Sequence, residues 1–501
     1  MKKLCLLLAL LLLLTGCGTN TGSPQSPTDT TTSANQNDIS PSVELVRFDI
    51  FAINDLHGRL TDTDFQPGVD ELSAYLKQAQ QAENTILLST GDMWQGTSEA
   101  NLTGGFIITE WMNELDFAAM TLGGHEYDWG EEQIRKNSQL AEFPFLGINV
   151  YNRQTDRQAD YCQSSLMVEA DGVQIGIIGA IGDCYASIAA EHTKDVYFKT
   201  GAELTVLVKA ESEKLRSQGA DFIIYCIHDG HDETYNGTSA MTVESQDLAD
   251  YYDTALSEGY VDLVFEADTH YSYVLMDQHD VYHLQAGGNN QGISHAIVLI
   301  DKTSGNASVM VAELVSSGKY SHLQDDPVVA QLLEKYAEQI APATQVLGNN
   351  RQYRSNYALC QLVAKLYCDK GTEKWGEEYD IVLGGGYIAC RSPGYMNTGQ
   401  VTYSQLQSLL PFDNQITLCS IQGRDLISKF LETDHHAYHI QTTPYGESIR
   451  NRIDPDATYY VVTDRYTSDY AYNNMTIVDT YDPNIFARDL LAEYIAAGGL
   501  D

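Results

Sequence analysis

The chain has 501 residues, a formal net charge of −40 and a hydrophobic content of 43%. That length exceeds what one hydrophobic core normally holds, and the apolar content excludes a chain that is disordered throughout. A surface with 69 acidic and 29 basic side chains repels nucleic-acid backbones, so we expect no polymeric nucleic-acid partner. Small phosphorylated substrates stay compatible with this charge, because bound cations reverse the field locally.

The first 42 residues predict an exported, lipid-anchored protein. Residues 1–16 contain two lysines and a leucine-rich run, the pattern of a secretory signal peptide and too short for a comfortable membrane span. The end of this run, Leu14 to Cys17, resembles a bacterial lipobox, which implies cleavage before Cys17 and its lipidation on the outer face of a membrane. Plain secretion or an uncleaved anchor is the alternative. Residues 17–42 are rich in Ser, Thr, Asn and Pro and predict a flexible tether.

From residue 43 onward, strand-like and helix-like segments alternate. Apolar or β-branched runs bounded by turn residues predict strands over 43–53, 84–90, 117–123, 143–150, 172–180, 221–227 and 261–267. Helical patterns cover 69–83 and 202–219. This order predicts an α/β fold in which a sheet is flanked by helices. The strands expected over 294–302 and 306–315 indicate a closing antiparallel portion.

A helix predicted over 326–342 leads into a second region. That region has its own amphipathic helix over 357–368 and its own strands over 379–385, 416–423 and 458–464. We therefore predict a first domain over 43–320, a linker helix within 321–345 and a second domain over 346–501. We expect the protein to be a monomer.

Seven cysteines follow Cys17, and none of them forms a CxxC pair. A structural zinc site is therefore not expected. A disulfide between Cys162 and Cys184 is one interpretation of their spacing, and buried free thiols are the alternative.

The strands of the first domain share one feature, because short turns carrying Asp or His follow them. The residues in these turns are Asp55, His57, Asp92, His125, Asp128, His228, Asp268 and His270. Ligand sites in α/β sheets collect outside the carboxyl ends of strands, so we expect these groups to converge. Carboxylates mixed with imidazoles suit Zn, Mn or Fe at an open catalytic site. Two cations about 4 Å apart can polarise a phosphoryl group and activate water.

The runs NDLHG, GDMWQGT, GHEYDWG and DTH resemble the calcineurin-like metallophosphoesterases. The closest resemblance is to the bacterial secreted 5′-nucleotidase, UDP-sugar hydrolase and 2′,3′-cyclic-nucleotide phosphodiesterase branch. Residues 394–416, GYMNTGQVTYSQLQSLLPFDNQI, resemble the C-terminal substrate domain of that branch. The resemblance implies a four-layer sandwich of two sheets flanked by helices, followed by a second α/β domain that binds substrate.

The resemblance also implies a role for each site residue. The first metal ion would be held by Asp55, His57, Asp92 and His270. Asp92 would bridge to a second ion that His228 also ligates, and Asp268 stands at a further ligand position of that ion.

His125, paired with Asp128, would be the catalytic histidine. In the second domain, Arg351 and Arg391 would bind phosphate or substrate. The rings of Phe412 and Tyr466 would clamp a base. The alternatives are surface charges for the two arginines and core packing for the two rings.

The sequence departs from the usual pattern at the second ion. Gly124 replaces an Asn ligand, and Asp268 replaces a His. An oxygen ligand in place of an imidazole favours a Mn-like ion there. Two motifs also differ in the second domain, LGGGYIACR and TDRYTSDYAYNN. We therefore weigh two hypotheses. One is a metal-dependent phosphohydrolase of the cell envelope that acts on nucleotides or related phosphoesters. The other is a degenerate relative that binds a nucleotide or sugar phosphate without turnover.

Overall fold

The computed structural model describes residues 44–62, 67–231, 255–388, 390–391, 393–431, 438–440, 453–471 and 474–500. The predicted signal peptide, Cys17 and the tether lie outside these ranges. Among the described residues, no helix combines the length and the apolar character that crossing a membrane requires.

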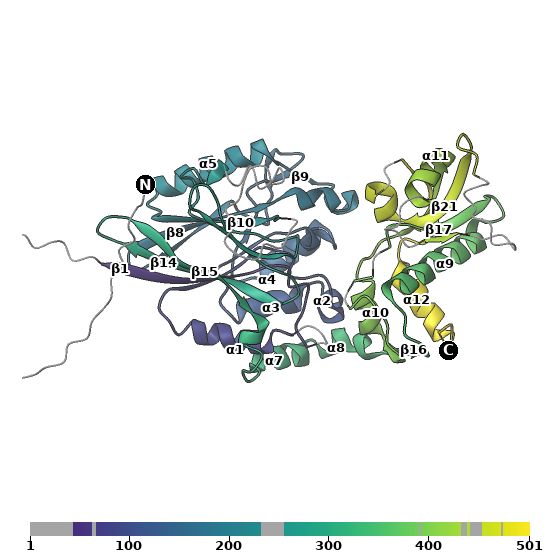
Figure 1. The fold of residues 1–501 in the computed structure, drawn as a ribbon, viewed down its shortest axis with the longest axis horizontal. Helices are drawn as coiled ribbons and strands as arrows, with labels where there is room; N and C mark the ends of the chain where they lie inside the picture. Colours follow the sequence, from purple (N-terminus) through teal and green to yellow (C-terminus); the bar gives the residue numbers. More distant parts are fainter. Residues whose placement is uncertain are drawn as a thin grey trace, which may run out of the picture. The chain divides into compact units, whose positions relative to one another are not determined.

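The first strand, β1, lies inside a six-stranded sheet with the order β15-β14-β1-β2-β3-β4 (Figure 1). These strands are β1 (Leu45–Ile53), β2 (Thr85–Ser89), β3 (Ala119–Thr121), β4 (Phe145–Leu146), β14 (Gly292–Asp301) and β15 (Ala307–Ser316). Strands β1 to β4 run parallel, whereas β14 and β15 pair antiparallel at one edge. The predicted antiparallel closure is confirmed.

A second six-stranded sheet has the order β12-β13-β11-β10-β8-β7. Its strands are β7 (Ser165–Ala170), β8 (Val173–Ile181), β10 (Phe222–His228), β11 (Leu263–Phe265), β12 (Ser272–Met276) and β13 (Tyr282–Ala286). Strands β8, β10, β11 and β13 are parallel, and β7 and β12 are antiparallel edges. A small sheet, β6-β5-β9, is built from Arg157–Gln158, Val150–Asn152 and Val196–Phe198.

Side-chain alternation along the strands explains how the two large sheets stack. On β1, Ile50 points into a core shared with Ile224 of β10, whereas Phe51 points into a different core on the opposite face. On β10, Tyr225 likewise faces away from the shared core. Because successive strand side chains alternate between faces, strands that are apolar on both faces must be covered on both sides.

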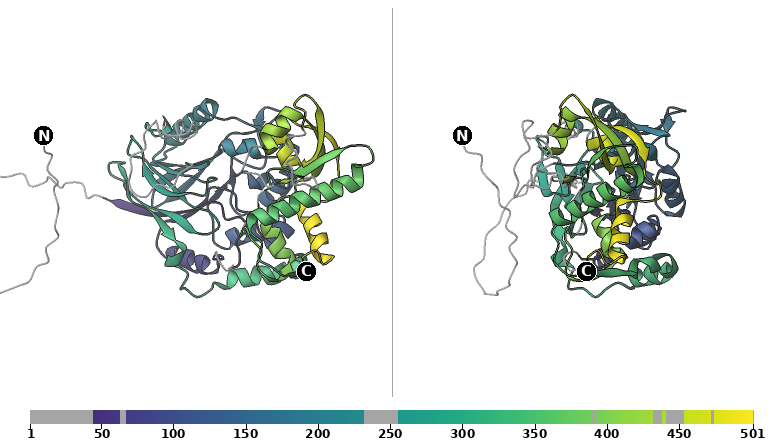
Figure 2. Two further views of the ribbon diagram at one scale, coloured as in Figure 1. Left: turned by 45° about the vertical axis from the view of Figure 1, so that its right-hand side comes forward. Right: turned by 90° about the vertical axis from the view of Figure 1, so that its right-hand side faces the viewer.

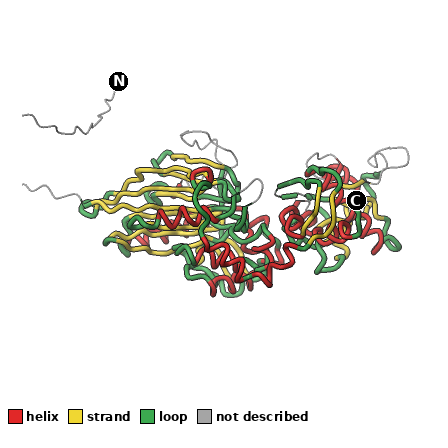
Figure 3. The backbone as a smooth tube through the Cα atoms, turned by 90° about the horizontal axis from the view of Figure 1, so that it is seen from below, coloured by secondary structure: helices red, strands yellow, loops and turns green. Residues whose placement is uncertain are grey.

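Helices provide that outer cover. The core on the outer face of the first sheet draws on α1 (Asp70–Ala79), α3 (Phe106–Asn113), α4 (Glu131–Leu140) and α7 (Pro327–Lys335). Helix α5 (Ala202–Ser217) packs on the outer face of the second sheet, through Leu204, Val208 and Leu215. Figure 3 shows the strands as inner layers with helices outside them. The fold is therefore the four-layer α/β sandwich that the sequence predicts.

The second region holds a five-stranded sheet with the order β20-β17-β21-β19-β22. Its strands are β17 (Ile381–Gly385), β19 (Ile416–Gln422), β20 (Tyr438–Ile440), β21 (Thr458–Asp464) and β22 (Thr476–Thr480). A two-stranded sheet pairs β16 (Val346–Asn350) with β18 (Gly399–Thr402). Figure 2 shows the long helix α9 (Asn356–Trp375) beside α12 (Ala487–Ala496). Short helices complete the chain: α2 (Ser98–Leu102), α10 (Tyr403–Leu409) and α11 (Gly423–Asp425).

Two local predictions are wrong. The helix expected over 326–342 is interrupted at Tyr336, whose backbone (φ −95°, ψ 8°) leaves the helical region while its ring is buried. It continues as α8 (Ala337–Ile340) and a 3-10 turn that contains Pro342. The strand expected over 143–150 is split between β4 and β5. Cys162 and Cys184 are free thiols, as the alternative to a disulfide had it.

Candidate metal centre and substrate cavity

The strand ends bring all six predicted metal ligands together. Their side-chain atoms form overlapping groups of three whose ligand atoms lie within 4.8 Å of one another. The groups are Asp55/His57/His270, Asp55/Asp92/His228, His57/Asp92/His125 and Cys184/His228/Asp268. The first three draw only on residues that the sequence singles out, and the fourth adds Cys184.

The backbone at these positions is strained in a consistent way. Five of the six predicted ligands have positive φ angles: Asp55 (50°), His57 (50°), Asp92 (55°), Asp268 (67°) and His270 (60°). Non-glycine residues adopt this left-handed region uncommonly and at a cost of about 1–3 kcal/mol each. Such strain persists where the surrounding structure enforces it, and it clusters at functional sites.

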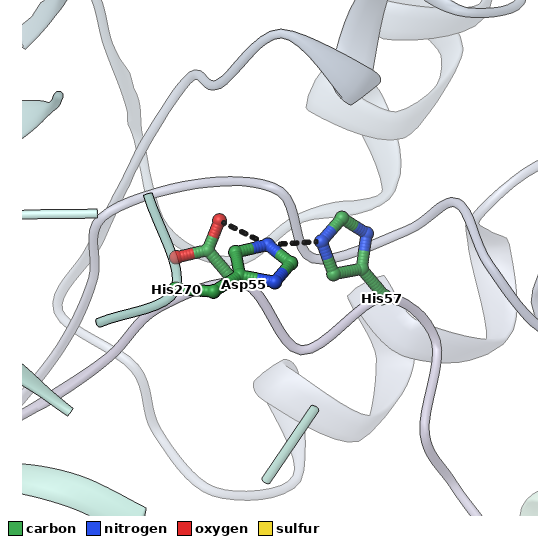
Figure 4. A group of neighbouring side chains, drawn as sticks. All are labelled: Asp55, His57 and His270. Carbon is green, nitrogen blue, oxygen red and sulfur yellow. Dashed lines mark hydrogen bonds and ion pairs between the residues drawn. The ribbon is translucent and has the colours of Figure 1, made fainter. Parts of the chain in front are cut away.

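The first ligand group is drawn in Figure 4. His270 Nε2 lies 3.4 Å from Asp55 Oδ1 and 3.0 Å from His57 Nε2. His57 Nδ1 lies 3.0 Å from the carbonyl oxygen of Gln95, which can accept only an N–H, so the His57 Nε2 lone pair faces His270. Burial and the neighbouring His270 lower the pKa of His57 to about 3, so its ring is neutral. Two ring nitrogens that converge beside a buried carboxylate fit a divalent cation.

The second group surrounds Asp92 and His228. His228 is fully buried, and its Nδ1 lies 2.7 Å from the carbonyl oxygen of Thr90 and donates to it. Its Nε2 lies 3.2 Å from Asp92 Oδ1 and 3.8 Å from Asp268 Oδ1, yet it has no hydrogen-bond partner. Burial lowers the pKa of His228, but Asp92, Asp55 and Asp268 outweigh burial and raise it well above its ordinary value. Carboxylates buried this closely attract positive charge, which a cation would supply.

His125 lies between this cluster and Asp128. Its Nδ1 is 2.9 Å from Asp128 Oδ2, and its Nε2 is 3.8 Å from Asp92 Oδ2. Burial alone would lower the pKa of His125, but the carboxylates of Asp128 and Asp92 overcome it and raise the pKa to about 9. The imidazole is thus oriented by one carboxylate and held in its protonated form beside another.

Sequence reasoning missed Glu126, which holds two site loops together. Its buried carboxylate accepts backbone N–H groups from Asp92 (2.9 Å), Met93 (2.9 Å) and Gly123 (2.7 Å). It thereby ties the loop after β2 to the loop after β3. The signal was its place beside His125 in the motif GHEYDWG.

The two glycines before His125 have different environments. A Cβ on Gly123 would collide with the Asp92 carboxylate and the His228 ring, so only glycine fits there. A Cβ on Gly124 would meet only Cys184 Sγ at 3.8 Å and Ile188 Cγ1 at 4.0 Å. With φ −67° and ψ −43°, Gly124 has backbone angles that any residue adopts.

The metal-ligand groups open into a cavity of about 370 Å³. Of the predicted substrate-binding residues, Arg391, Phe412 and Tyr466 line it, together with His125 and Asp128. The Phe412 ring stacks on the His125 ring at 5.4 Å and 17°, and the Arg391 guanidinium lies 5.0 Å from the Phe412 ring centre. Aromatic and guanidinium groups therefore face the metal-ligand groups across the cavity.

Arg351 is placed elsewhere. Its backbone N–H donates to Leu500, and Arg351 is not among the described residues that line the cavity. The prediction that it binds substrate gains no support from its position. Sequence reasoning also missed Tyr387, which lines the cavity and lies 5.8 Å from Tyr466, ring centre to ring centre.

Three curated relatives share these features at low identity. The chain is 25% identical over 418 residues to Endonuclease YhcR of Bacillus subtilis, covering 76% of this chain and 32% of that protein. It is 25% identical over 418 residues to Apyrase of Tabanus yao, covering 76% and 72%. It is 24% identical over 442 residues to Snake venom 5'-nucleotidase of Naja atra, covering 80% of each. The chain thus spans about a third of the first relative's length. No protein-family model matches the chain.

A solved structure shows the same fold. The putative 5'-nucleotidase of Staphylococcus aureus, in complex with alpha-ketoglutarate, superposes with a TM-score of 0.70 at 16% identity, covering 91% of this chain and 98% of that one. The fold is thus that of nucleotidase structures with a metallophosphoesterase domain and a C-terminal domain. The sequence relatives of this chain include 5'-nucleotidases and apyrases.

Proposed function

We propose that the protein is a metal-dependent phosphohydrolase of the secreted 5′-nucleotidase family, acting on nucleotides or related phosphoesters. In this proposal residues 43–320 form the metallophosphoesterase domain and 346–501 the substrate-binding domain. The observation that carries the proposal is the cavity. Cation-ligand groups lie on one side of it, and a guanidinium with aromatic rings lies on the other.

Two divalent ions, when bound, would polarise the phosphoryl group and activate water. Asp55, His57, Asp92 and His270 are the proposed ligands of the first ion. Asp92, His228 and Asp268 are the proposed ligands of the second. The buried carboxylates fix these positions, and Glu126 holds the Asp92 loop in register with His125.

His125 is the proposed catalytic acid. Its raised pKa keeps a proton on the ring, and Asp128 orients Nδ1 so that Nε2 faces the ligand groups. A protonated imidazole in this position stabilises charge that develops on a leaving oxygen and can transfer its proton to it. Asp128 acts as the orienting partner in this step.

The opposite side of the cavity would bind the rest of the substrate. Arg391 offers a planar guanidinium suited to phosphate, and Phe412 and Tyr466 offer faces on which a base can stack. Arg351 remains a proposed phosphate contact on sequence grounds alone.

The proposed ions are Mn, Zn or Fe. If only the predicted ligands acted, Asp268 would give the second position an extra oxygen and favour a Mn-like ion. The metals suited to the first position are less restricted, because it combines two imidazoles with two carboxylates.

The rival function, binding without turnover, draws on Gly124 and Asp268 at the second position. A screen of the soluble form from near Gln36 separates the two. Nucleoside mono-, di- and triphosphates, cyclic nucleotides and UDP-sugars are assayed with added Mn, Zn or Fe, and Asp92→Ala serves as the inactive control. Turnover lost in the control supports the hydrolase. Nucleotide binding without turnover at saturating metal supports the rival.

We further propose that the mature protein is exported and anchored by lipid at Cys17, with its catalytic part in water. The motif from Leu14 to Cys17 carries this proposal. Cys17→Ser should release the protein from membranes or leave it unprocessed. Mass spectrometry that finds an unmodified mature N-terminus elsewhere would contradict lipidation.

A further inference from the structure

Cys184 lies at the same sheet edge as the metal-ligand groups. Strands β8 and β10 pair in parallel with Ile181 opposite His228, and Cys184 follows β8 in a 3-10 turn, Asp183–Ser187. The Cys184 thiol, a ring nitrogen of His228 and a carboxylate oxygen of Asp268 lie within 4.8 Å of one another. Three ligand types therefore meet from three consecutive strand ends.

The ring of His228 supplies an independent sign of a ligand. Its Nδ1 donates to the carbonyl of Thr90, so Nε2 carries the lone pair available to a cation. This nitrogen is buried and has no hydrogen-bond partner. A buried polar atom without a partner is rare and calls for an unseen ion or water. Here it belongs to the same group as the thiol.

Gly124 leaves room for the thiol. A Cβ at this position would lie 3.8 Å from Cys184 Sγ, which shows that the sulfur occupies the space toward which a side chain at 124 would point. Residue 124 brings no ligand of its own, and Cys184 comes closest to that space from another loop.

We propose that Cys184 is a thiolate ligand of a Zn-like cation that His228 and Asp268 also hold. The proposal deepens the function proposed above, because this cation would be the second ion of the site. When the metal–sulfur bond forms, the thiol proton leaves to solvent and no atom is oxidised or reduced. Thiolate is a soft ligand that favours Zn over Mn. The preference for Mn that Asp268 suggests counts oxygen ligands only, so the two hypotheses predict different metals.

Cobalt provides a direct test, because Co²⁺ bound to thiolate gives a charge-transfer band in the near ultraviolet that oxygen and nitrogen ligands do not give. The metal-free protein is titrated with Co²⁺. We expect the band in the wild type and in Cys162→Ser, and its loss in Cys184→Ser. Cys162 is a matched control, because it is also a half-buried free thiol and belongs to none of the ligand groups. Absence of the band from folded wild type with cobalt bound overturns the proposal.

Zinc retention gives a second readout. Cys184→Ala should weaken binding of one Zn²⁺ per chain by at least about 10–100-fold, the effect of losing a group that merely orients a ligand. Cys162→Ala should leave both ions bound. Equal zinc affinity in wild type and Cys184→Ala, measured after dialysis against a chelator, contradicts the assignment.

A wild-type experiment avoids any folding defect in the variants. Zn²⁺ should slow alkylation of Cys184 by iodoacetamide at least tenfold and leave alkylation of Cys162 unchanged, as peptide mass spectrometry can show in one sample. Equal alkylation of Cys184 with and without zinc overturns the proposal. A cobalt–sulfur band without phosphoester turnover supports the ligand and refutes the hydrolase. Turnover without the band refutes the ligand alone.

Discussion

The two sides of the cavity are built from different kinds of segment. The proposed metal ligands stand at the ends of sheet strands, and Asp55 and His228 are fully buried. On the opposite side, Arg391 is exposed, and Phe412 and Tyr466 are half-buried on the connections that follow α10 and β21. The first side has fixed geometry and buried charge, whereas the second has aromatic faces and solvent contact.

This difference separates two tasks. Cations and transferring phosphoryl groups need ligands held in one geometry, because electrostatic stabilisation depends on preorganisation. A base that stacks on rings tolerates variation in position. We therefore expect substitutions on the metal side to reduce metal content and kcat, and substitutions on the aromatic side to raise KM.

The largest effect should come from Asp92→Ala. Asp92 belongs to two ligand groups, so its removal should release both ions and lower the rate to background. Metal content by mass spectrometry and phosphatase rate check this together. A variant that stays fully loaded would break the proposed bridge.

His125→Ala should keep both ions bound and lower kcat by about 10²–10⁴-fold, the usual contribution of a general acid or base. Asp128→Asn should have a smaller effect in the same direction, because it removes only the group that orients the ring. The check is kcat at saturating metal alongside metal content. Loss of metal in His125→Ala would move this residue from the acid role to the ligand set.

His283 tests the buried charge beneath the metal side. Its Nδ1 lies 2.6 Å from Glu266 and its Nε2 3.6 Å from Asp277, all three buried. Burial lowers the pKa of His283, but Glu266 and Asp277 outweigh burial and raise it to about 10. His283→Gln should lower the free energy of unfolding by about 3–5 kcal/mol at neutral pH.

The pH dependence of this effect follows from the direction of the shift. The folded-state pKa is raised, so the stabilisation is complete below pH 6.5 and is lost as pH rises toward about 10. Urea unfolding at pH 6, 8 and 10 should show the wild type and His283→Gln converging. Lys302→Gln, which breaks an exposed pair with Glu44, is the control and should cost about 1 kcal/mol or less. A gap that stays constant with pH would contradict the charged triad.

Phe412→Ala and Tyr466→Ala should raise KM for nucleotides by about 1–3 kcal/mol, the scale of one stacked base. The KM for a small aryl phosphate should change less, and metal content should not change. Equal losses on both substrates would mean that the rings serve packing and that the two sides of the cavity do not divide the work.

The smallest effect is expected for Gly124→Asn. The backbone at 124 accepts the new residue without strain, and its amide oxygen would approach the second ion from the side of Cys184. Mn²⁺ affinity should rise by about tenfold or less, the scale of one neutral polar group. A Mn²⁺ titration of wild type and variant decides this, and unchanged affinity would show that residue 124 does not reach the ion.

The metal side was predictable because its chemistry follows a regular grammar. Each apolar strand is recognisable, and the residue types that follow it stand out, as with Asp55 and His228. Cys184 escaped because a thiol two residues beyond Gly182 resembles a buried apolar residue until β8 and β10 are placed side by side. Glu126 escaped because its partners are backbone N–H groups, which sequence does not mark.

The aromatic side was less predictable. Arg351 and Arg391 look equivalent in sequence, yet only Arg391 lines the cavity. Loops direct their side chains through tertiary contacts, so residue type alone does not show which arginine faces the ligand. The interruption at Tyr336 has a similar cause, since burial of its ring outweighs the local helical pattern.

The pairing of β1 with β14 has a consequence for when the protein acquires its ions. Asp49 of β1 pairs with Ile297 of β14, and the backbone N–H of Asn289 donates to the carbonyl of Asp55. The segment that carries Asp55 is therefore completed only by residues far along the chain, and such non-local closure is slow. A nascent chain that lacks β14 holds no finished crevice. The ion supply where the full-length chain folds, rather than that at the ribosome, would then decide which cations are captured.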